Sequence, residues 1–251
     1  MINAASIVAA LSLPADARVD QRVPKTLLVE NGAPTAADKR QINNGIEELQ
    51  WVAALKPATI GVPAYSDATR EYLEIAVLSL TLRAEAKSNR LTELIHRAIP
   101  YPVLLIQSQA SSVALSLGHL RWSQGQAGHT VLDGLLVTAS LDSESSTTSG
   151  FLASLNVANQ PHTNLQALYQ GWIERFEAYA AAQLTGAFVP SPDALSAEQR
   201  RVALAEHERL TREIAALRAR AAKESQINRL VDINLQLKQL NAQRSQFSSS
   251  L

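Results

Sequence analysis

The sequence changes character at residues 189–193, Val-Pro-Ser-Pro-Asp, and this change constrains the fold more than any other feature. From residue 196 to the end there is no glycine or proline, and Glu, Arg, Gln, Ala and Leu are the common residues. All ten glycines lie before the change. Because glycine and proline disfavour helix interiors, the pattern predicts a domain at 1–190 followed by a helical tail at 191–251.

The tail carries apolar residues at steps of three and four, which is the spacing of one helix face. A first series is Leu210, Ile214 and Leu217, and a second series is Leu230, Ile233, Leu237 and Leu240. The two series are offset near 224–228, which predicts either a local distortion or a break into two helices. An apolar face is unfavourable in water, so we predict that these seven residues bind a partner, in a coiled coil or a helical hairpin.

The first 190 residues alternate between predicted helices and strands. Thr35 is a suitable N-cap, and the spacing of Ile42, Ile46 and Leu49 predicts an amphipathic helix over 36–55. Other helices are expected at 3–11, 90–98 and 164–184, strands at 27–29, 72–83, 103–107, 113–117 and 132–140, and a polar loop at 142–150. We therefore predict an α+β fold, with a mixed or mostly antiparallel sheet and flanking helices, followed by the long helical tail.

Composition excludes several classes of site. The chain has no cysteine, which excludes disulfides, thiolate metal sites and cysteine nucleophiles. Its 23 Lys and Arg residues balance 23 Asp and Glu residues, so no overall positive charge favours nucleic acid. No window approaches the roughly 18 apolar residues of a membrane span, and the N-terminus lacks the positive charge of a secretory signal. We expect a cytoplasmic protein that does not enter a membrane.

Motifs for catalysis are sparse. The glycines form no phosphate-binding loop, and no two of the five histidines have the i, i+4 spacing of a helical metal pair. We therefore predict no metal and no cofactor. One carboxylate pattern, Asp67 followed by Glu85 and Lys87, is loosely similar to the Mg²⁺-dependent cores of restriction-type nucleases. The simpler interpretation is a solvated loop, because Glu85 and Lys87 lie beyond the predicted strand.

Basic residues offer an alternative function. Lys25, Lys39 and Arg40 lie near the start of the helix predicted over 36–55, and Arg229 lies in the tail. Contacts from these side chains to phosphates would bind nucleic acid, with DNA as the partner. Glutamates alternate with the arginines of the tail, however, and such mixed charge is typical of the solvated face of a coiled coil. Both interpretations stay open.

Four segments give the chain a resemblance to a bacterial family known only as a domain of unknown function. They are residues 23–25 with 35–39, residues 46–55 around Trp51, the Ile-Pro-Tyr-Pro segment that opens 99–105, and the tail segment 226–234 with its Gln-Ile-Asn-Arg start. Members of that family are encoded beside helicases and DNA methyltransferases in restriction or phage-defence islands. The resemblance implies an accessory role in defence and supplies no catalytic residues.

These observations lead to one expected function and two alternatives. We expect a non-enzymatic accessory or assembly subunit of a bacterial restriction or phage-defence system, which binds a partner protein through its helical tail. The partner is either a second copy of the chain or a helicase or methyltransferase. The alternatives are a nucleic-acid-binding module and, less favoured, a Mg²⁺-dependent nuclease.

Overall fold

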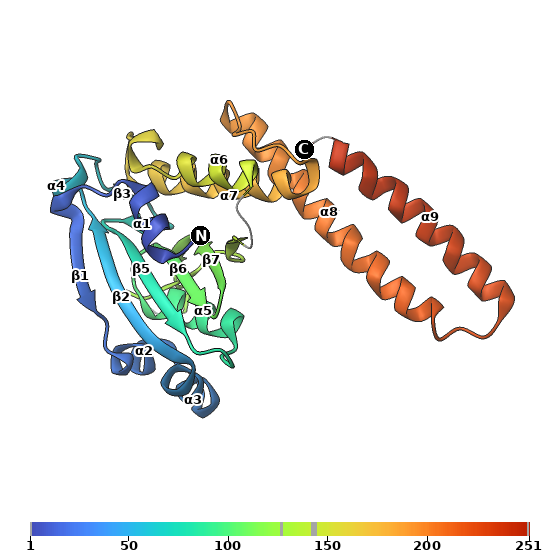
Figure 1. The fold of residues 1–251 in the computed structure, drawn as a ribbon, viewed down its shortest axis with the longest axis horizontal. Coiled ribbons are helices and arrows are strands. Elements are labelled where there is room, and N and C mark those ends of the chain that lie inside the picture. The colour runs from blue at the N-terminus through green and yellow to red at the C-terminus, as the bar shows by residue number, and fades with distance from the viewer. Residues whose placement is uncertain (1, 126–127, 142–144, 250) are drawn as a thin grey trace. The chain divides into compact units, whose positions relative to one another are not determined.

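A computed structural model describes residues 2–125, 128–141, 145–249 and 251. The chain forms two compact units, Met1–Phe176 and Glu177–Leu251 (Figure 1). The division predicted at residue 190 lies within the second of these units. The predicted fold class is confirmed, because a mixed sheet with flanking helices is followed by a long helical region.

The first unit is built on a six-stranded sheet in the order β1-β2-β5-β6-β7-β10. Its strands are β1 (Arg18–Arg22), β2 (Ile46–Leu55), β5 (Ile75–Leu82), β6 (Val103–Gln109), β7 (Ser112–Leu117) and β10 (Val137–Ser140). β5 and β6 pair in parallel, whereas the other neighbours pair antiparallel, including the predicted β6–β7 hairpin. Two short hairpins join β3 (Tyr65–Ser66) to β4 (Glu71–Tyr72) and β8 (Leu120–Trp122) to β9 (Thr130–Leu132).

Helices cover this sheet. They are α1 (Ala4–Leu11), α2 (Lys25–Gly32), α3 (Ala36–Gly45), α4 (Pro57–Ile60), α5 (Ser88–Ala98), α6 (Ser146–Ser154) and the start of α7 (Leu165–Thr185), with short 3-10 turns at Ala15–Ala17 and Val157–Asn159. One hydrophobic cluster joins Leu28 of α2 and Leu91 of α5 to Leu78 of β5. Residues 75–78 of β5 are fully buried, so this strand is covered on both faces, as its continuous apolar sequence predicts.

The helix predicted over 36–55 is wrong in its second half, because α3 ends at Gly45 and residues 46–55 form β2. β2 pairs with β1 on one side and with β5 on the other. Its register with β5 shifts between Ile46 and Glu48, where an extra residue resets the alternation of side chains. Ile46 and Leu49 therefore lie in the same hydrophobic core, although they are three residues apart in a strand. A spacing of three is also typical of one helix face, and for this reason the sequence pattern predicted a helix.

Three other segments differ from the prediction. Residues 27–29 are helical rather than extended, because α2 packs against α5 and buries Leu28. The strand predicted over 132–140 is divided into β9 and β10 by a loop in which Gly134 has a φ of 90°. Within the polar loop predicted at 142–150, residues 142–144 lie outside the described residues, and α6 begins at Ser146 with Ser145 as its N-cap.

The second unit contains a helical hairpin, which is one of the two arrangements predicted for the tail. α8 (Ala194–Ala221) and α9 (Ile227–Ser249) contact each other and lie side by side in Figure 1. The chain reverses between them at 222–226, where the two apolar series are out of register. Among the described residues, no helix combines the length and hydrophobicity needed to cross a membrane.

Candidate functional site

The three residues predicted for a nuclease do not come together. Asp67 lies in the β3–β4 hairpin, before β5, whereas Glu85 and Lys87 are exposed in the turn that follows β5. The strand between them has eight residues and is therefore about 26 Å long. Three side chains separated in this way cannot hold one metal ion. Among the described residues, no group of three or more His, Asp or Glu side chains is placed to hold one.

Asp67 stabilises the β3–β4 hairpin in which it lies. Its carboxylate accepts hydrogen bonds from the Tyr65 hydroxyl at 2.7 Å, from the Thr69 amide at 2.6 Å and from the Arg70 amide at 2.8 Å. The bond from Tyr65, followed by those from Thr69 and Arg70, holds the pKa of Asp67 well below its usual range. The carboxylate is thus a charged acceptor that closes a turn.

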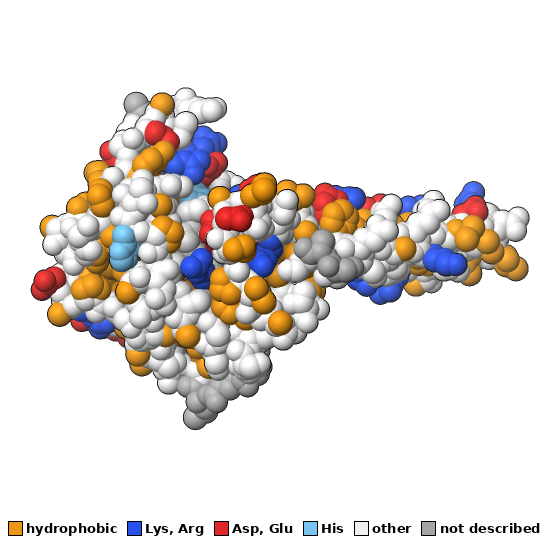
Figure 2. Space-filling model, turned by 90° about the horizontal axis from the view of Figure 1, so that it is seen from above, with side chains coloured by type: hydrophobic (Ala, Val, Ile, Leu, Met, Phe, Trp, Pro, Cys, Tyr) orange, Lys and Arg blue, Asp and Glu red, His pale blue; other side chains and the backbone are white. Residues whose placement is uncertain are grey.

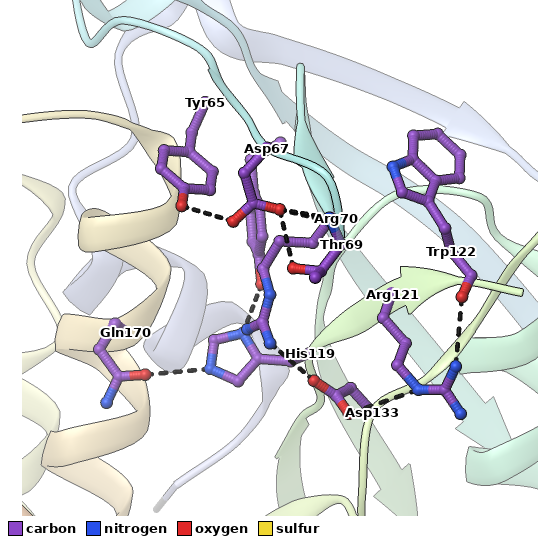
Figure 3. Close-up of polar contacts among 10 residues, drawn as sticks. Tyr65, Asp67, Thr69, Arg70, His119, Arg121, Trp122, Asp133 and Gln170 are labelled. Carbon is purple, nitrogen blue, oxygen red and sulfur yellow. Dashed lines mark hydrogen bonds and ion pairs between the residues drawn. The ribbon is translucent and has the colours of Figure 1, made fainter. Parts of the chain in front are cut away.

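The structure instead collects a polar cluster around His119, which the sequence did not predict (Figure 3). His119 Nδ1 contacts the Tyr72 hydroxyl, and His119 Nε2 lies 3.0 Å from Gln170 Oε1 of α7. Burial raises the pKa of Tyr72, so its hydroxyl stays protonated and donates to Nδ1. A neutral imidazole with its proton on Nε2 satisfies both contacts.

Two arginines of this cluster share one carboxylate. Asp133 accepts from Arg70 Nη2 at 2.8 Å and lies 3.6 Å from Arg121 Nε. Arg70 and Asp133 are 63 residues apart in sequence, so this ion pair connects the end of the β3–β4 hairpin to the end of the β8–β9 hairpin. The sequence did not predict this ion pair, because no local sequence motif indicates a contact between residues so far apart.

The cluster is organised to hold loops together rather than to react. Next to the rings of His119 and Tyr72, the buried Tyr169 hydroxyl accepts from the Gly118 amide at 2.8 Å and donates to the Val103 carbonyl at 2.8 Å. Both His119 nitrogens have partners, and the Asp133 carboxylate is shared by two arginines. A general base needs a nitrogen or carboxylate that can reach a substrate proton, and this arrangement occupies those groups.

The four residues predicted to contact nucleic acid have different environments. Lys25 Nζ donates to the Asn43 carbonyl at 3.1 Å and to the Ile46 carbonyl, so it ties α2 to the junction of α3 and β2. Burial, followed by the charges of Arg83 and Arg22, lowers the pKa of Lys25. Lys39 and Arg40 are exposed on α3, and Arg229 is exposed near the start of α9. Lys25 thus has a structural role.

The seven residues predicted to bind a partner form the interior of the α8–α9 hairpin. Leu210, Ile214, Leu217 and Ile233 are buried, and Leu230, Leu237 and Leu240 are half-buried. Each helix is therefore the partner of the other along this stripe. A protein that docks on the hairpin must use another face.

Such a face exists on α9. Ile227, Val231 and Leu235 are 78%, 52% and 57% exposed, and they recur every four residues. This outer row lies on a different side of α9 from Leu230, Ile233 and Leu237, since a helix turns by about 100° per residue. Figure 2 shows hydrophobic side chains at the surface of the hairpin, at the right of the view.

Four cations gather where the hairpin reverses. Arg218, Arg220, Lys223 and Arg229 are exposed, and within the described residues none of them makes an ion pair. Other arginines of α8 differ: Arg209, for example, pairs with Glu206 and Glu213 at 3.0 Å. We call these four residues the tip cations.

The comparison with known families gives one match. A family model described as "Domain of unknown function (DUF4391)" matches residues 11–243 and thus extends over most of both units. Searches among curated proteins and among solved structures found no significant match.

Proposed function

Since this chain belongs to the DUF4391 family, we propose that it is a non-enzymatic accessory subunit of a bacterial restriction or phage-defence system. It binds a helicase or DNA methyltransferase through its helical hairpin. The observation that carries the proposal is the exposed outer row of α9, Ile227, Val231 and Leu235. The defence setting comes from the family resemblance, and the docking surface comes from the exposure of these three side chains.

The outer row suits a protein partner. A helix that buries one apolar stripe normally has polar residues on its other faces, because exposure of apolar surface to water is unfavourable. An exposed apolar row on such a helix therefore indicates a surface that another protein covers. The row spans about two helical turns, about 12 Å, and has three side chains, whereas each side of a stable interface uses roughly 20–30 residues. It therefore serves as the apolar centre of a contact with a larger partner, rather than as the whole interface between two copies.

The polar groups support a role without catalysis. The carboxylate of Asp67 closes a turn, and the imidazole of His119 is held between Tyr72 and Gln170. Each of these groups stabilises a loop of the first unit. An accessory subunit needs such a rigid frame and a docking surface, and it needs no reactive group of its own.

The partner contact can be tested by co-purification of the tagged full chain with the helicase and methyltransferase of its genomic neighbourhood. We expect the double substitution Val231→Glu and Leu235→Glu to reduce recovery of the partner at least tenfold, because two charges enter an apolar contact. Gln236→Glu combined with Gln243→Glu adds the same two charges at exposed positions of α9 outside the outer row, and should retain the partner. Far-UV circular dichroism should show the same helix content in all three proteins.

Two outcomes would contradict this proposal. One is equal recovery of the partner with the Val231→Glu, Leu235→Glu variant and with the Gln236→Glu, Gln243→Glu control. The other is light scattering that shows a dimer of the full chain which the double substitution dissociates, because the outer row would then bind a second copy.

A second candidate function, binding of nucleic acid, is favoured by the tip cations. Four exposed cations without carboxylate partners are available to phosphates. Phosphate contacts release counterions, so the logarithm of the binding constant falls with the logarithm of salt concentration, by about 0.9 for each contact on duplex DNA. The candidate thus predicts a salt dependence that the apolar outer row does not.

The tip cations can be tested by the binding of a labelled DNA duplex to the full chain over a range of salt. We expect Arg218→Gln combined with Arg229→Gln to weaken binding and to reduce the slope by about two. Arg209→Gln combined with Arg212→Gln removes the same charge from residues that pair with glutamates, and should change binding less. Absence of any complex at low salt would eliminate this function.

A further inference from the structure

A groove of about 750 Å³ lies over the β10 side of the sheet in the first unit. Its floor is formed by Ala114 and Ser116 of β7 and by Thr138 and Ser140 of β10, which face each other as the pairs Ser116–Thr138 and Ala114–Ser140. These side chains are small, so they leave a hollow between α5 on one side and the β9–β10 loop on the other. The volume is in the range of ligand-binding clefts in proteins.

The groove opens at the edge of the sheet that β10 forms. β10 is the last strand of the sheet, and no other described strand pairs with its outer side. The Leu141 amide donates to the Val113 carbonyl of β7 at 2.8 Å. Hydrogen bonding alternates along an antiparallel strand, so residues 139 and 137 also face β7, and the amide and carbonyl of Thr138 face outward.

The lining of the groove favours an uncharged ligand. Its charged side chains are Glu93 and Arg97, which pair with each other at 2.7 Å. The hydroxyl of Ser116 is hydrogen-bonded to the buried His96 at 2.8 Å. Around these groups the lining is apolar or neutral, and Leu135, on the β9–β10 loop, is 88% exposed. A ligand with a net charge would find no counterion here that is not already paired.

We propose that β10 accepts an extended, uncharged peptide segment of a partner protein as an added strand. The outward amide and carbonyl of Thr138 pair with the peptide backbone, and alternate side chains of the peptide enter the groove. The groove supplies selectivity by shape, while the amide and carbonyl of Thr138 supply hydrogen bonds that a backbone in extended conformation can match. The pairing rests on the two outward groups of Thr138. This site does not depend on the outer row of α9 or on the tip cations.

A phage-displayed library of random seven-residue peptides, selected on the immobilised full chain, tests the site. Enriched sequences, synthesised with blocked ends, are then titrated calorimetrically against the chain and its variants. We expect Thr138→Pro to weaken binding at least tenfold, because proline removes the outward amide and leaves the bonds to β7 in place. Thr138→Val keeps the amide and should bind like the parent. Tryptophan fluorescence during denaturation shows whether each variant is folded.

A third variant separates strand addition from simple filling of the groove. Ala114→Leu occupies the floor and should also weaken the peptide. The proposal is overturned if no peptide is enriched over the empty support, or if Thr138→Pro binds the enriched peptides as tightly as Thr138→Val. In the second case, a loss of binding in Ala114→Leu would mean that the groove holds a side chain or a small molecule without pairing at the edge.

Discussion

Replacement of Ile214 by aspartate is expected to unfold the α8–α9 hairpin and to leave the first unit folded. Ile214 is 1% exposed and lies between Leu210 and Leu217 on the face that meets α9. The substitution removes a large apolar side chain and places an unpaired carboxylate in its position, at a cost of about 3–5 kcal/mol. α8 and α9 are held together by one apolar stripe. A loss of about 3–5 kcal/mol therefore exceeds the free energy of unfolding that we expect for this hairpin.

Two spectroscopic signals separate the two units in this experiment. Trp51, Trp122 and Trp172 all precede residue 177, so tryptophan fluorescence reports on the first unit only. α8 and α9 have 28 and 23 residues, and their unfolding would remove a large part of the far-UV signal at 222 nm. We expect Ile214→Asp to lose that signal while its fluorescence spectrum stays that of the parent chain.

The matched control is Val231→Asp, which introduces the same side chain at a position that is 52% exposed. This control should keep its helix content. If Ile214→Asp also kept the helix content of the parent, the stripe from Leu210 to Leu217 would not be the interior of a hairpin. The partner-binding role first predicted for those residues would then be the better explanation of their spacing.

The stability of the first unit is expected to fall as the pH drops below 6.5, because of His96. This histidine is 1% exposed, and burial lowers its pKa to about 3. The unfolded chain binds a proton with a pKa near 6.5, whereas the folded chain stays neutral down to about 3. Between these values the unfolded state binds more protons, so the contribution is complete above pH 6.5 and is lost toward pH 3, at up to about 1.4 kcal/mol per pH unit.

The measurement is the free energy of unfolding from pH 7 to pH 5, followed by tryptophan fluorescence in urea. Asp38 stays charged over this range, because hydrogen bonds from Arg90 and Thr35 lower its pKa to about 2. His96→Asn removes the titrating group and can still bond to Ser116. Its free energy of unfolding should be lower at pH 7 but should depend much less on pH.

His207 provides the control for this experiment. Burial and the charge of Arg244 lower its pKa as well, so it contributes a dependence of the same sign to the second unit. Fluorescence of the first unit should not detect His207→Asn. An equal slope in the parent chain and in His96→Asn would show that His96 is not the source of the dependence.

Several elements were predicted correctly because their signals are local. Thr35 caps α3 through the Asp38 amide at 3.1 Å, and the apolar sequence of β5 matches its burial on both faces. The short link between β6 and β7 specified their antiparallel pairing. The offset of the two apolar series in the tail marks the place where the chain reverses. Each of these features depends on residues within a few positions of one another.

Other features depend on contacts between distant residues. β2 is a strand because β1 and β5 lie beside it, and its shifted register explains the spacing of Ile46 and Leu49. The cluster of His119, Tyr72 and Gln170 joins segments 47 and 51 residues apart. The apolar stripe first predicted to bind a partner is buried between α8 and α9, so the candidate docking surface is the exposed outer row of α9 instead.

The sequence by itself determined the change from a mixed domain to a helical tail, the approximate bounds of α1, α5 and α7, and the absence of cysteine chemistry. These follow from propensity, capping and composition, which act over a few residues. Only the tertiary structure decided which apolar stripe is buried, which charged groups are already paired and where the sheet keeps an open edge. Those properties depend on which segments, distant in sequence, come into contact. The free-energy cost of burying a polar or charged group depends on whether one of these segments provides a partner for it.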